Sequence, residues 1–227
     1  MTSKLDLGAD YRTAREEVAA LIRTLAPEQL AAEVPACPGW SVHDVVSHLT
    51  GVANDAVNGR LRGMPEPAQT AAQVAERAAT PTSIVLREWE RTASQYEAVL
   101  SKASSSSVAT VVDVVVHEQD IRGAVGLPGN RANPLIDQAV ERTLEHFASK
   151  VESAGLPAVV IRDGDEVISG SAEAPVAYRT SVFEAFRAVY GRRSRSQIER
   201  RFSGADEPGA YVPLLCVFGP AEEDIIE

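Results

Sequence analysis

Apolar residues at helical spacing recur through the first two thirds of this 227-residue chain, and this pattern constrains its fold most strongly. The predicted helices span residues 10–26, 41–59, 81–103 and 133–155. After Gly155 the pattern changes to short β-like runs, two of which flank Asp163 and Gly164, a hairpin signal. Helices followed by short strands predict an α+β protein.

We place the domain boundary near residue 155, so that residues 1–155 form a helical domain and residues 156–227 a small α/β domain. In the second domain "PVAYRTS" predicts a third strand. "VFEAFRAVYGRRS" and "RSQIERRFS" have helical patterns, and "YVPLLCVFG" is either a strand or a buried segment. "RGMPEPAQ", earlier in the chain, is expected to interrupt the helical pattern.

The segment "CPGWSVHDVVSHLTG" begins as a turn and continues as a helix. Ser41 and Asp44 have the spacing of a capping box, which fixes the start of that helix. His48 then falls on the apolar stripe. A histidine at such a position is either a hydrogen-bonded core residue or a ligand, and the segment alone leaves both readings open.

The run "VVDVVVHEQD" is rich in valine, which favours a strand, but the residues after it have a helical pattern. On a helix Asp113 and His117 lie one turn apart on the same face. A carboxylate within an apolar run is costly to bury unless a cation or hydrogen-bond donors satisfy it. We therefore expect a helix and a bound cation, although Asp113 and His117 could instead hydrogen-bond to each other.

An antiparallel helix pair would bring His48 to Asp113 and His117. Two imidazoles and one carboxylate suit zinc, iron, nickel or manganese, and three ligands leave positions open for water or substrate. We take zinc as the expected ion.

The charge of the chain limits its partners. A net charge of −10 argues against nucleic acid and anionic membranes as partners. No apolar run approaches the roughly 20 residues needed to cross a bilayer, and the first residues have no signal-like stretch. Cys37 and Cys216 form no CxxC motif, so we expect reduced cysteines and a cytoplasmic protein. We also expect either a monomer or a homodimer.

Four further polar side chains have weaker patterns. Asp120 is expected either to orient an imidazole from the second coordination shell or to pair with Arg122 or Arg131. His43 and His146 are expected in solvent, and Glu118 is expected to be solvated or paired away from the Asp113 face.

Trp40 and Cys37 precede the second helix. Trp40 has the position of a hydrophobic staple, with lining a pocket as the alternative. Cys37 is expected to be a buried structural thiol rather than a nucleophile, since no basic residue surrounds it in sequence.

"CPGWSVHDVVSHLTG" and "DVVVHEQDIRGAVG" together resemble the two hallmark segments of the mycothiol-dependent maleylpyruvate isomerase family, one of the DinB-like metal-binding bundles. "FEAFRAVYGRRSRSQIERRF" and "FGPAEEDIIE" resemble the C-terminal region of its members. The resemblance implies an up-down-type four-helix bundle and metal ligation by His48, Asp113 and His117. The family has glutamate at the position of Asp113.

The resemblance also implies mycothiol as a thiol cosubstrate. Addition of a thiolate to a cis double bond permits rotation, and elimination returns the trans product. A C-terminal arginine acts in the family's isomerase, which Arg192 or Arg193 could match; the alternative is a solvated basic helix end.

We therefore expect a divalent-metal-dependent enzyme that uses a low-molecular-weight thiol on a small electrophile, as an isomerase or a thiol transferase. The alternatives are a non-catalytic metal-binding or regulatory module of the same fold, and a helical protein without metal.

Overall fold

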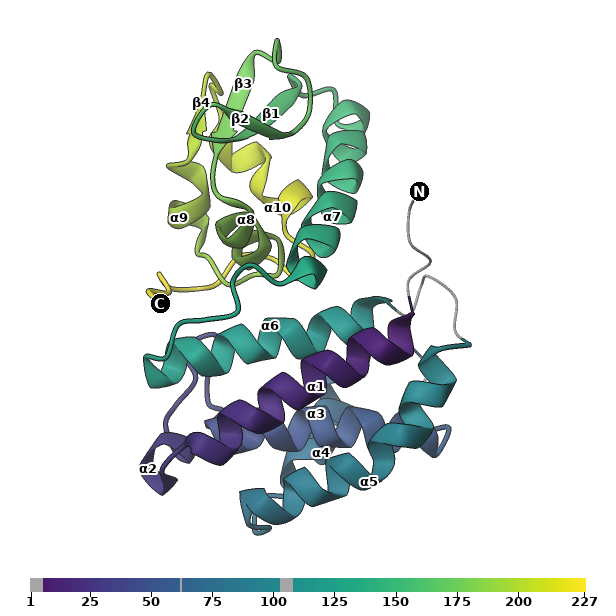
Figure 1. Cartoon of the computed structure of the whole chain (residues 1–227). Coiled ribbons are helices and arrows are strands. Elements are labelled where there is room, and N and C mark those ends of the chain that lie inside the picture. The colour runs from purple at the N-terminus through teal and green to yellow at the C-terminus, as the bar shows by residue number, and fades with distance from the viewer. Residues whose placement is uncertain (1–5, 62, 103–107) are drawn as a thin grey trace. The chain divides into compact units, whose positions relative to one another are not determined.

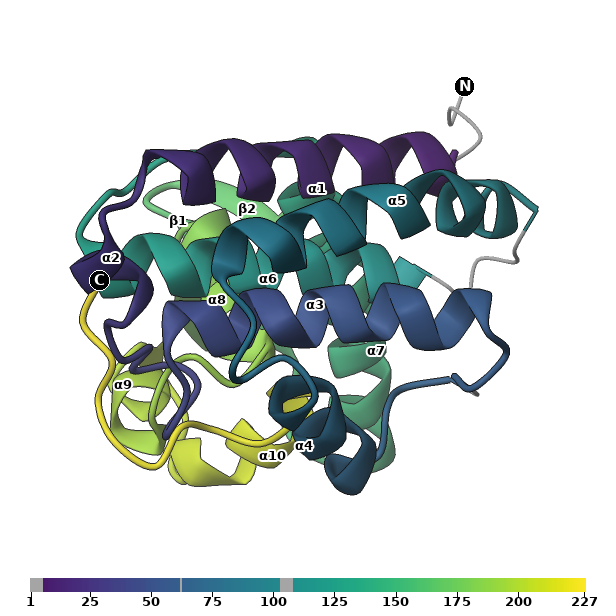
Figure 2. The same ribbon diagram turned by 90° about the horizontal axis from the view of Figure 1, so that it is seen from below.

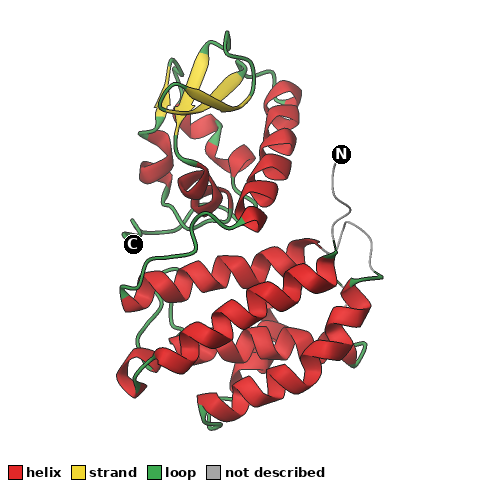
Figure 3. Ribbon diagram, in the orientation of Figure 1, coloured by secondary structure: helices red, strands yellow, loops and turns green. Residues whose placement is uncertain are grey.

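The computed structural model describes residues 6–61, 63–102 and 108–227 (Figure 1). Its contacts divide the chain into two compact units, Met1–Gly129 and Asn130–Glu227. Figure 3 shows that the described part of the first unit is helical, whereas the second combines helices with a small sheet. This is the predicted α+β fold class.

The first unit is a helical bundle, as expected. Its elements are α1 (Leu7–Thr24), α2 (Pro27–Leu30), α3 (Val42–Val57), α4 (Pro67–Ala75), α5 (Thr82–Leu100) and α6 (Val108–Val125). The four longest helices, α1, α3, α5 and α6, pack together, and Figure 2 shows α1 beside α5 and α4 beside α3. The helix predicted around Asp113 is confirmed as α6, whose valines are buried on several faces, as in a helix inside a core.

Contacts between the helices show their relative directions. Arg12 and Arg23 of α1 pair with Glu97 and Glu90 of α5, so these helices are antiparallel. In contrast α3 and α5 are parallel: the start of α3 contacts the start of α5 through His43 and Thr82, and Asn54 contacts Glu88 further along both. The connection over residues 58–81 makes this possible, because it carries the chain back along α3.

This connection contains α4, which begins at Pro67 inside the segment expected only to interrupt the pattern. The fixed φ angle of proline suits the first position of a helix, so Pro67 starts α4.

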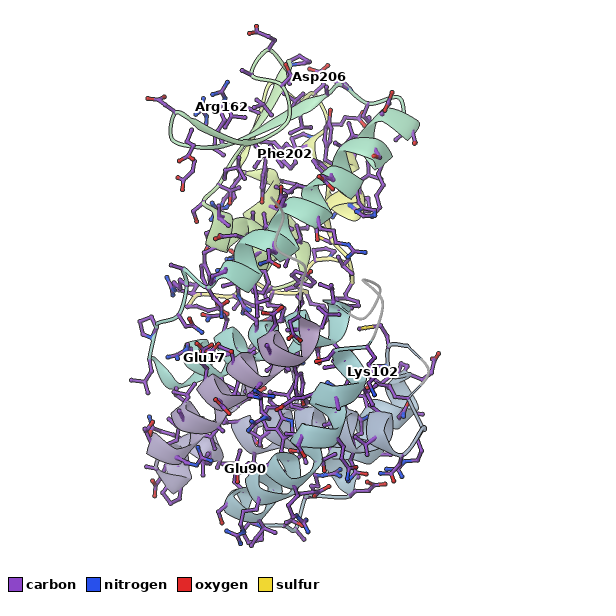
Figure 4. The ribbon with its side chains drawn as sticks, turned by 45° about the vertical axis from the view of Figure 1, so that its right-hand side comes forward. Glu17, Glu90, Lys102, Arg162, Phe202 and Asp206 are labelled. Carbon is purple, nitrogen blue, oxygen red and sulfur yellow. The ribbon has the colours of Figure 1, made fainter. Side chains whose placement is uncertain are left out.

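The second unit contains helix α7 (Pro134–Ser153), strands β1 (Val159–Asp163), β2 (Glu166–Ser169), β3 (Val176–Arg179) and β4 (Phe202–Ser203), and short helices α8 (Val182–Val189), α9 (Arg195–Glu199) and α10 (Val212–Leu215), with a 3₁₀ turn at Pro208–Ala210. The sheet order is β2-β1-β3-β4. The predicted hairpin joins β1 to β2, and Gly164 has the positive φ that its turn requires. Phe202, labelled in Figure 4, contacts the rings of Tyr178 and Tyr211.

For this unit the structure decides between the two readings of one segment, and its contacts divide the chain at a different residue from the predicted boundary. The segment "YVPLLCVFG" forms α10 and not a strand, although Val212 and Leu215 are buried as the second reading required. The division after Gly129 also differs from the boundary near residue 155, because the apolar stripe of α7 packs on α8 and α10. Periodicity identifies the buried face of a helix but not the element that covers it.

None of the described helices is long and apolar enough to cross a membrane.

Candidate metal centre

The site begins on α3, where the N-terminal cap fixes the start of the helix. Ser41 accepts a hydrogen bond from the backbone N–H of Asp44, and the Asp44 carboxylate accepts one from the backbone N–H of Ser41. This is the predicted capping box. Two turns into the helix, His48 is buried with 5% of its surface exposed.

Helix α6 brings two more ligand-type side chains to His48. One carboxylate oxygen of Asp113 lies 3.6 Å from Nε2 of His48, and the other lies 3.6 Å from Nε2 of His117. Ligand atoms of the three residues all lie within 4.8 Å of one another. The antiparallel arrangement of α3 and α6 is confirmed, because Cys37 lies near Asp120 while His48 lies near Asp113.

These separations fit a shared ion better than direct hydrogen bonds. Good N–H···O hydrogen bonds span about 2.7–3.2 Å, which is shorter than either contact. Ligand atoms about 2.1 Å from one ion in a tetrahedral array lie roughly 3.4 Å apart. The donor set of two imidazoles and one carboxylate therefore has the spacing and the chemistry to hold a divalent ion.

The other nitrogen of each imidazole has its own partner. Nδ1 of His117 lies 2.9 Å from a carboxylate oxygen of Asp120, which is 1% exposed. Nδ1 of His48 lies 2.9 Å from the amide oxygen of Gln73 on α4. Both partners offer acceptor oxygens, so this arrangement favours a proton on Nδ1 of each ring and leaves Nε2 to face Asp113. Such partners orient imidazoles that bind metals.

The buried Asp120 thus makes the hydrogen bond expected of a residue that orients an imidazole. Gln73 is a residue that the sequence reasoning missed. It lies on α4, in a stretch without a recognisable motif.

The three side chains line a cavity of about 320 Å³, at the lower end of the size of small-molecule sites. Trp40 and Cys37 also line it, and the indole ring of Trp40 lies 5.3 Å from the imidazole of His48. Most of the remaining wall is apolar; it includes Val52, Leu61, Met64 and Pro65. Trp40 therefore lines the pocket, the alternative to its staple position.

The prediction that Cys37 is a buried structural thiol is wrong, because its side chain is half-buried and lines the cavity. Its Sγ lies 3.5 Å from Asp120 and 3.8 Å from Nδ1 of His117. Cys37, His117 and Asp120 form a second group with metal-ligand spacing. That group converges on Nδ1, the nitrogen already hydrogen-bonded to Asp120, so the first group is the better candidate for an ion.

Three other predicted positions have mixed outcomes. His43 is half-buried and bonded to Thr82 and to the carbonyl of Arg77, so the prediction that it lies in solvent is wrong. His146 is exposed, as expected. Glu118 is fully buried and paired with Arg122.

Arg192 and Arg193 belong to the second unit. Arg193 is buried and pairs with Glu184 and Glu227, which is not the solvated helix end of the alternative reading. Arg192 is half-buried and donates to the carbonyl of Tyr190. A role for Arg192 in catalysis stays a prediction.

Comparisons with known proteins give a family match for part of the chain. Residues 11–122 match the family model described as the mycothiol maleylpyruvate isomerase N-terminal domain. No curated protein sequence matches the chain significantly.

Two solved structures have the same fold. They are the crystal structures of a mycothiol-dependent maleylpyruvate isomerase and of a histidine-to-alanine mutant of such an enzyme, with TM-scores of 0.51 and 0.55. Each is 12% identical and covers 82% of this chain and 88% of its own. Likeness at this identity establishes the fold only.

The family match spans the helices that carry His48, Asp113 and His117. Residues 11–122 of this chain therefore belong to the family of mycothiol maleylpyruvate isomerase N-terminal domains.

Proposed function

We propose that this protein is a divalent-metal-dependent enzyme that uses a low-molecular-weight thiol, mycothiol or a close relative, on a small electrophile. The reaction is an isomerisation or a thiol transfer. One observation carries the proposal: the two oxygens of Asp113 each lie 3.6 Å from the Nε2 atom of a different histidine, at the wall of a cavity.

Each residue of the centre has a distinct task in this proposal. His48 and His117 supply nitrogen ligands through Nε2, because Gln73 and Asp120 occupy the Nδ1 side of each ring. Asp113 supplies the negative charge that balances a cation. Zinc is the expected ion, and iron, nickel and manganese accept the same ligands.

A bound divalent ion would lower the pKa of a coordinated thiol, so that the thiol reacts as a thiolate at neutral pH. The chain's own residues then need only bind and orient the reactants. The apolar wall, with Trp40 and Val52, suits the carbon skeleton of a small electrophile and limits the entry of water.

A non-catalytic metal-binding module is the second candidate. Such a site is expected to have a closed coordination shell with a fourth protein ligand. Among the described residues, the group around Asp113 contains three side chains, and Cys37 falls in the other group, near the opposite nitrogen of His117. The open side of the centre therefore favours the enzyme.

Metal content tests the proposal first. Purified protein is expected to carry one divalent ion per chain by elemental analysis, and His48→Ala or His117→Ala is expected to remove it. His146→Ala is the matched control, because His146 is exposed and lies in the other unit. The proposal fails if metal-free protein takes up no zinc, nickel, iron or manganese.

Turnover then separates the two candidates. The enzyme is expected to consume electrophiles such as maleylpyruvate only with added thiol, and both histidine variants should lose this activity. Two results together would favour the non-catalytic module. One is metal uptake without turnover, and the other is an absorption spectrum of the cobalt-substituted protein that indicates a closed coordination shell.

A further inference from the structure

Helix α4 contacts the centre through one glutamine, and this contact belongs to a longer chain of hydrogen bonds. Gln73 is 2% exposed, and its amide oxygen lies 2.9 Å from Nδ1 of His48. Its amide nitrogen lies 2.8 Å from a carboxylate oxygen of Asp55, which is 7% exposed. Asp55 also accepts hydrogen bonds from Arg60 and Gln69.

Asp55 fixes which groups donate and which accept along this series of hydrogen bonds. Partial burial disfavours the charged form of Asp55, but hydrogen bonds from Gln73, Arg60 and Gln69 hold its pKa below the ordinary value. The ionised carboxylate only accepts hydrogen bonds, so the amide nitrogen of Gln73 must face it. The amide oxygen then faces His48, whose Nδ1 must carry the proton.

The face of α3 is shaped to receive this glutamine. His48, Gly51 and Asp55 have the spacing of one helix face, and Gln69 and Gln73 occupy one face of α4. A Cβ atom on Gly51 would lie 2.5 Å from both Cβ and Cγ of Gln73. Glycine inside a helix costs about 1 kcal/mol relative to alanine, so its presence here calls for a reason, and the close approach of Gln73 supplies one.

We propose that Gln73, held by Asp55 and admitted by Gly51, is a positioning residue that fixes the tautomer of His48 and so keeps its Nε2 free for the metal. This inference rests on the proposed metal centre. In it α4, through Gln73, orients one of the metal ligands. Outer partners of this kind typically change metal affinity 10–100-fold when removed.

The tautomer can be tested without any metal. Histidine labelled with ¹⁵N in metal-free protein is expected to show His48 protonated on Nδ1 and unprotonated on Nε2. In Gln73→Leu the proton should move toward Nε2. Gln69→Leu is the matched control: it removes an amide donor from the same carboxylate, one turn earlier on α4, without touching His48. A wild-type His48 protonated on Nε2, or an unchanged tautomer in Gln73→Leu, would overturn the inference.

Metal affinity provides the second measurement. In competitive titrations with zinc, Gln73→Leu is expected to bind about 10–100-fold more weakly than wild type, and Gln69→Leu within about threefold. The double variant Gln73→Glu with Asp55→Asn keeps an acceptor toward His48 and a donor–acceptor pair toward residue 55, so it should recover most of the affinity. Equal losses in both leucine variants, or no recovery in the double variant, would reduce Gln73 to a packing role.

The two proposals fail in different ways. Wild-type protein that takes up no zinc, nickel, iron or manganese refutes the metal centre, while the ¹⁵N tautomer still decides the part played by Gln73. Normal zinc binding by Gln73→Leu refutes the inference and leaves the metal centre intact.

Discussion

Asp120 lies one turn beyond His117 on α6, and its carboxylate oxygen is 2.9 Å from Nδ1 of that histidine. Almost no surface of Asp120 is exposed, so this contact is shielded from water. We expect Asp120→Ala to weaken zinc binding about 10–100-fold, because His117 loses the acceptor that keeps its proton on Nδ1. Asp120→Asn, which retains an oxygen acceptor, should lose less. Competitive zinc titration checks this order, and wild-type affinity in Asp120→Ala would contradict it.

Asp113 allows the length of the acidic ligand to be tested. Its oxygens reach both histidines, so Asp113→Ala is expected to abolish metal uptake. Asp113→Glu should retain an ion, since glutamate is the residue of the family pattern at this position. The metal-to-protein ratio after dialysis measures both outcomes. Metal retained by Asp113→Ala would mean that the ion lies elsewhere.

The two cysteines are expected to differ in reactivity. Cys37 lines the cavity, whereas Cys216 is 5% exposed and donates to the carbonyl of Ala188. Burial raises the pKa of Cys216 from 9.0 to about 11, which lowers its thiolate fraction about 100-fold.

Iodoacetamide should therefore modify Cys37 first, as measured by peptide mass mapping at neutral pH. Cys37→Ser should remove the fast phase. Equal labelling of both thiols in folded protein would contradict the assignment.

Glu184 is expected to make the stability of the second unit depend on pH. It accepts hydrogen bonds from Arg193 and Arg201. Although burial opposes ionisation, these arginines hold the pKa of Glu184 below its ordinary value of 4.5. A folded pKa below the unfolded one stabilises the fold above about pH 4.5, and this contribution is lost as the pH falls through the folded pKa.

Calorimetric unfolding between pH 3 and pH 7 should show this loss, with a smaller slope in Glu184→Gln. At neutral pH the variant is expected to be less stable by about 1–3 kcal/mol, because Arg193 is left buried with a weaker partner. An unchanged slope would assign the pH dependence to other groups.

Gly51→Ala separates helix stability from site geometry. Alanine favours α3 by about 1 kcal/mol, but its Cβ would displace Gln73. We expect zinc affinity to fall as it does in Gln73→Leu, while the thermal midpoint changes little. Chemical shifts of His48 in the metal-free variant give an independent reading. Full zinc affinity in Gly51→Ala would show that α4 can move without affecting His48.

The sequence predicts those parts of the centre that depend on short-range spacing. Four-residue spacing places Asp113 and His117 on one helix face, and the Ser41 cap fixes the start of α3. To predict the antiparallel pairing of α3 and α6, it is enough to note that both helices carry ligand-type residues on an apolar face. Asp120 follows in the same way, one turn beyond His117.

The parts that the sequence could not predict depend on packing partners. Gln73 has no motif, and its importance comes from the close approach of α4 to Gly51. Cys37 lies in a turn whose path has no periodicity, so its place in the cavity wall depends on the docking of that turn near α6. The assignment of α7 to the second unit has the same cause, since an apolar stripe fits more than one neighbour.

The distance in sequence between His48 and His117 also bears on the stability of the first unit. Because α4 and α5 lie between His48 and His117 in sequence, an ion bound by both would close a loop of residues 48–117. The unfolded chain would have to close that loop before it could hold the ion with both histidines, so the folded chain would bind the ion far more tightly and be stabilised by it. Loss of such an ion would therefore lower the stability of the helical unit as well as empty the proposed centre.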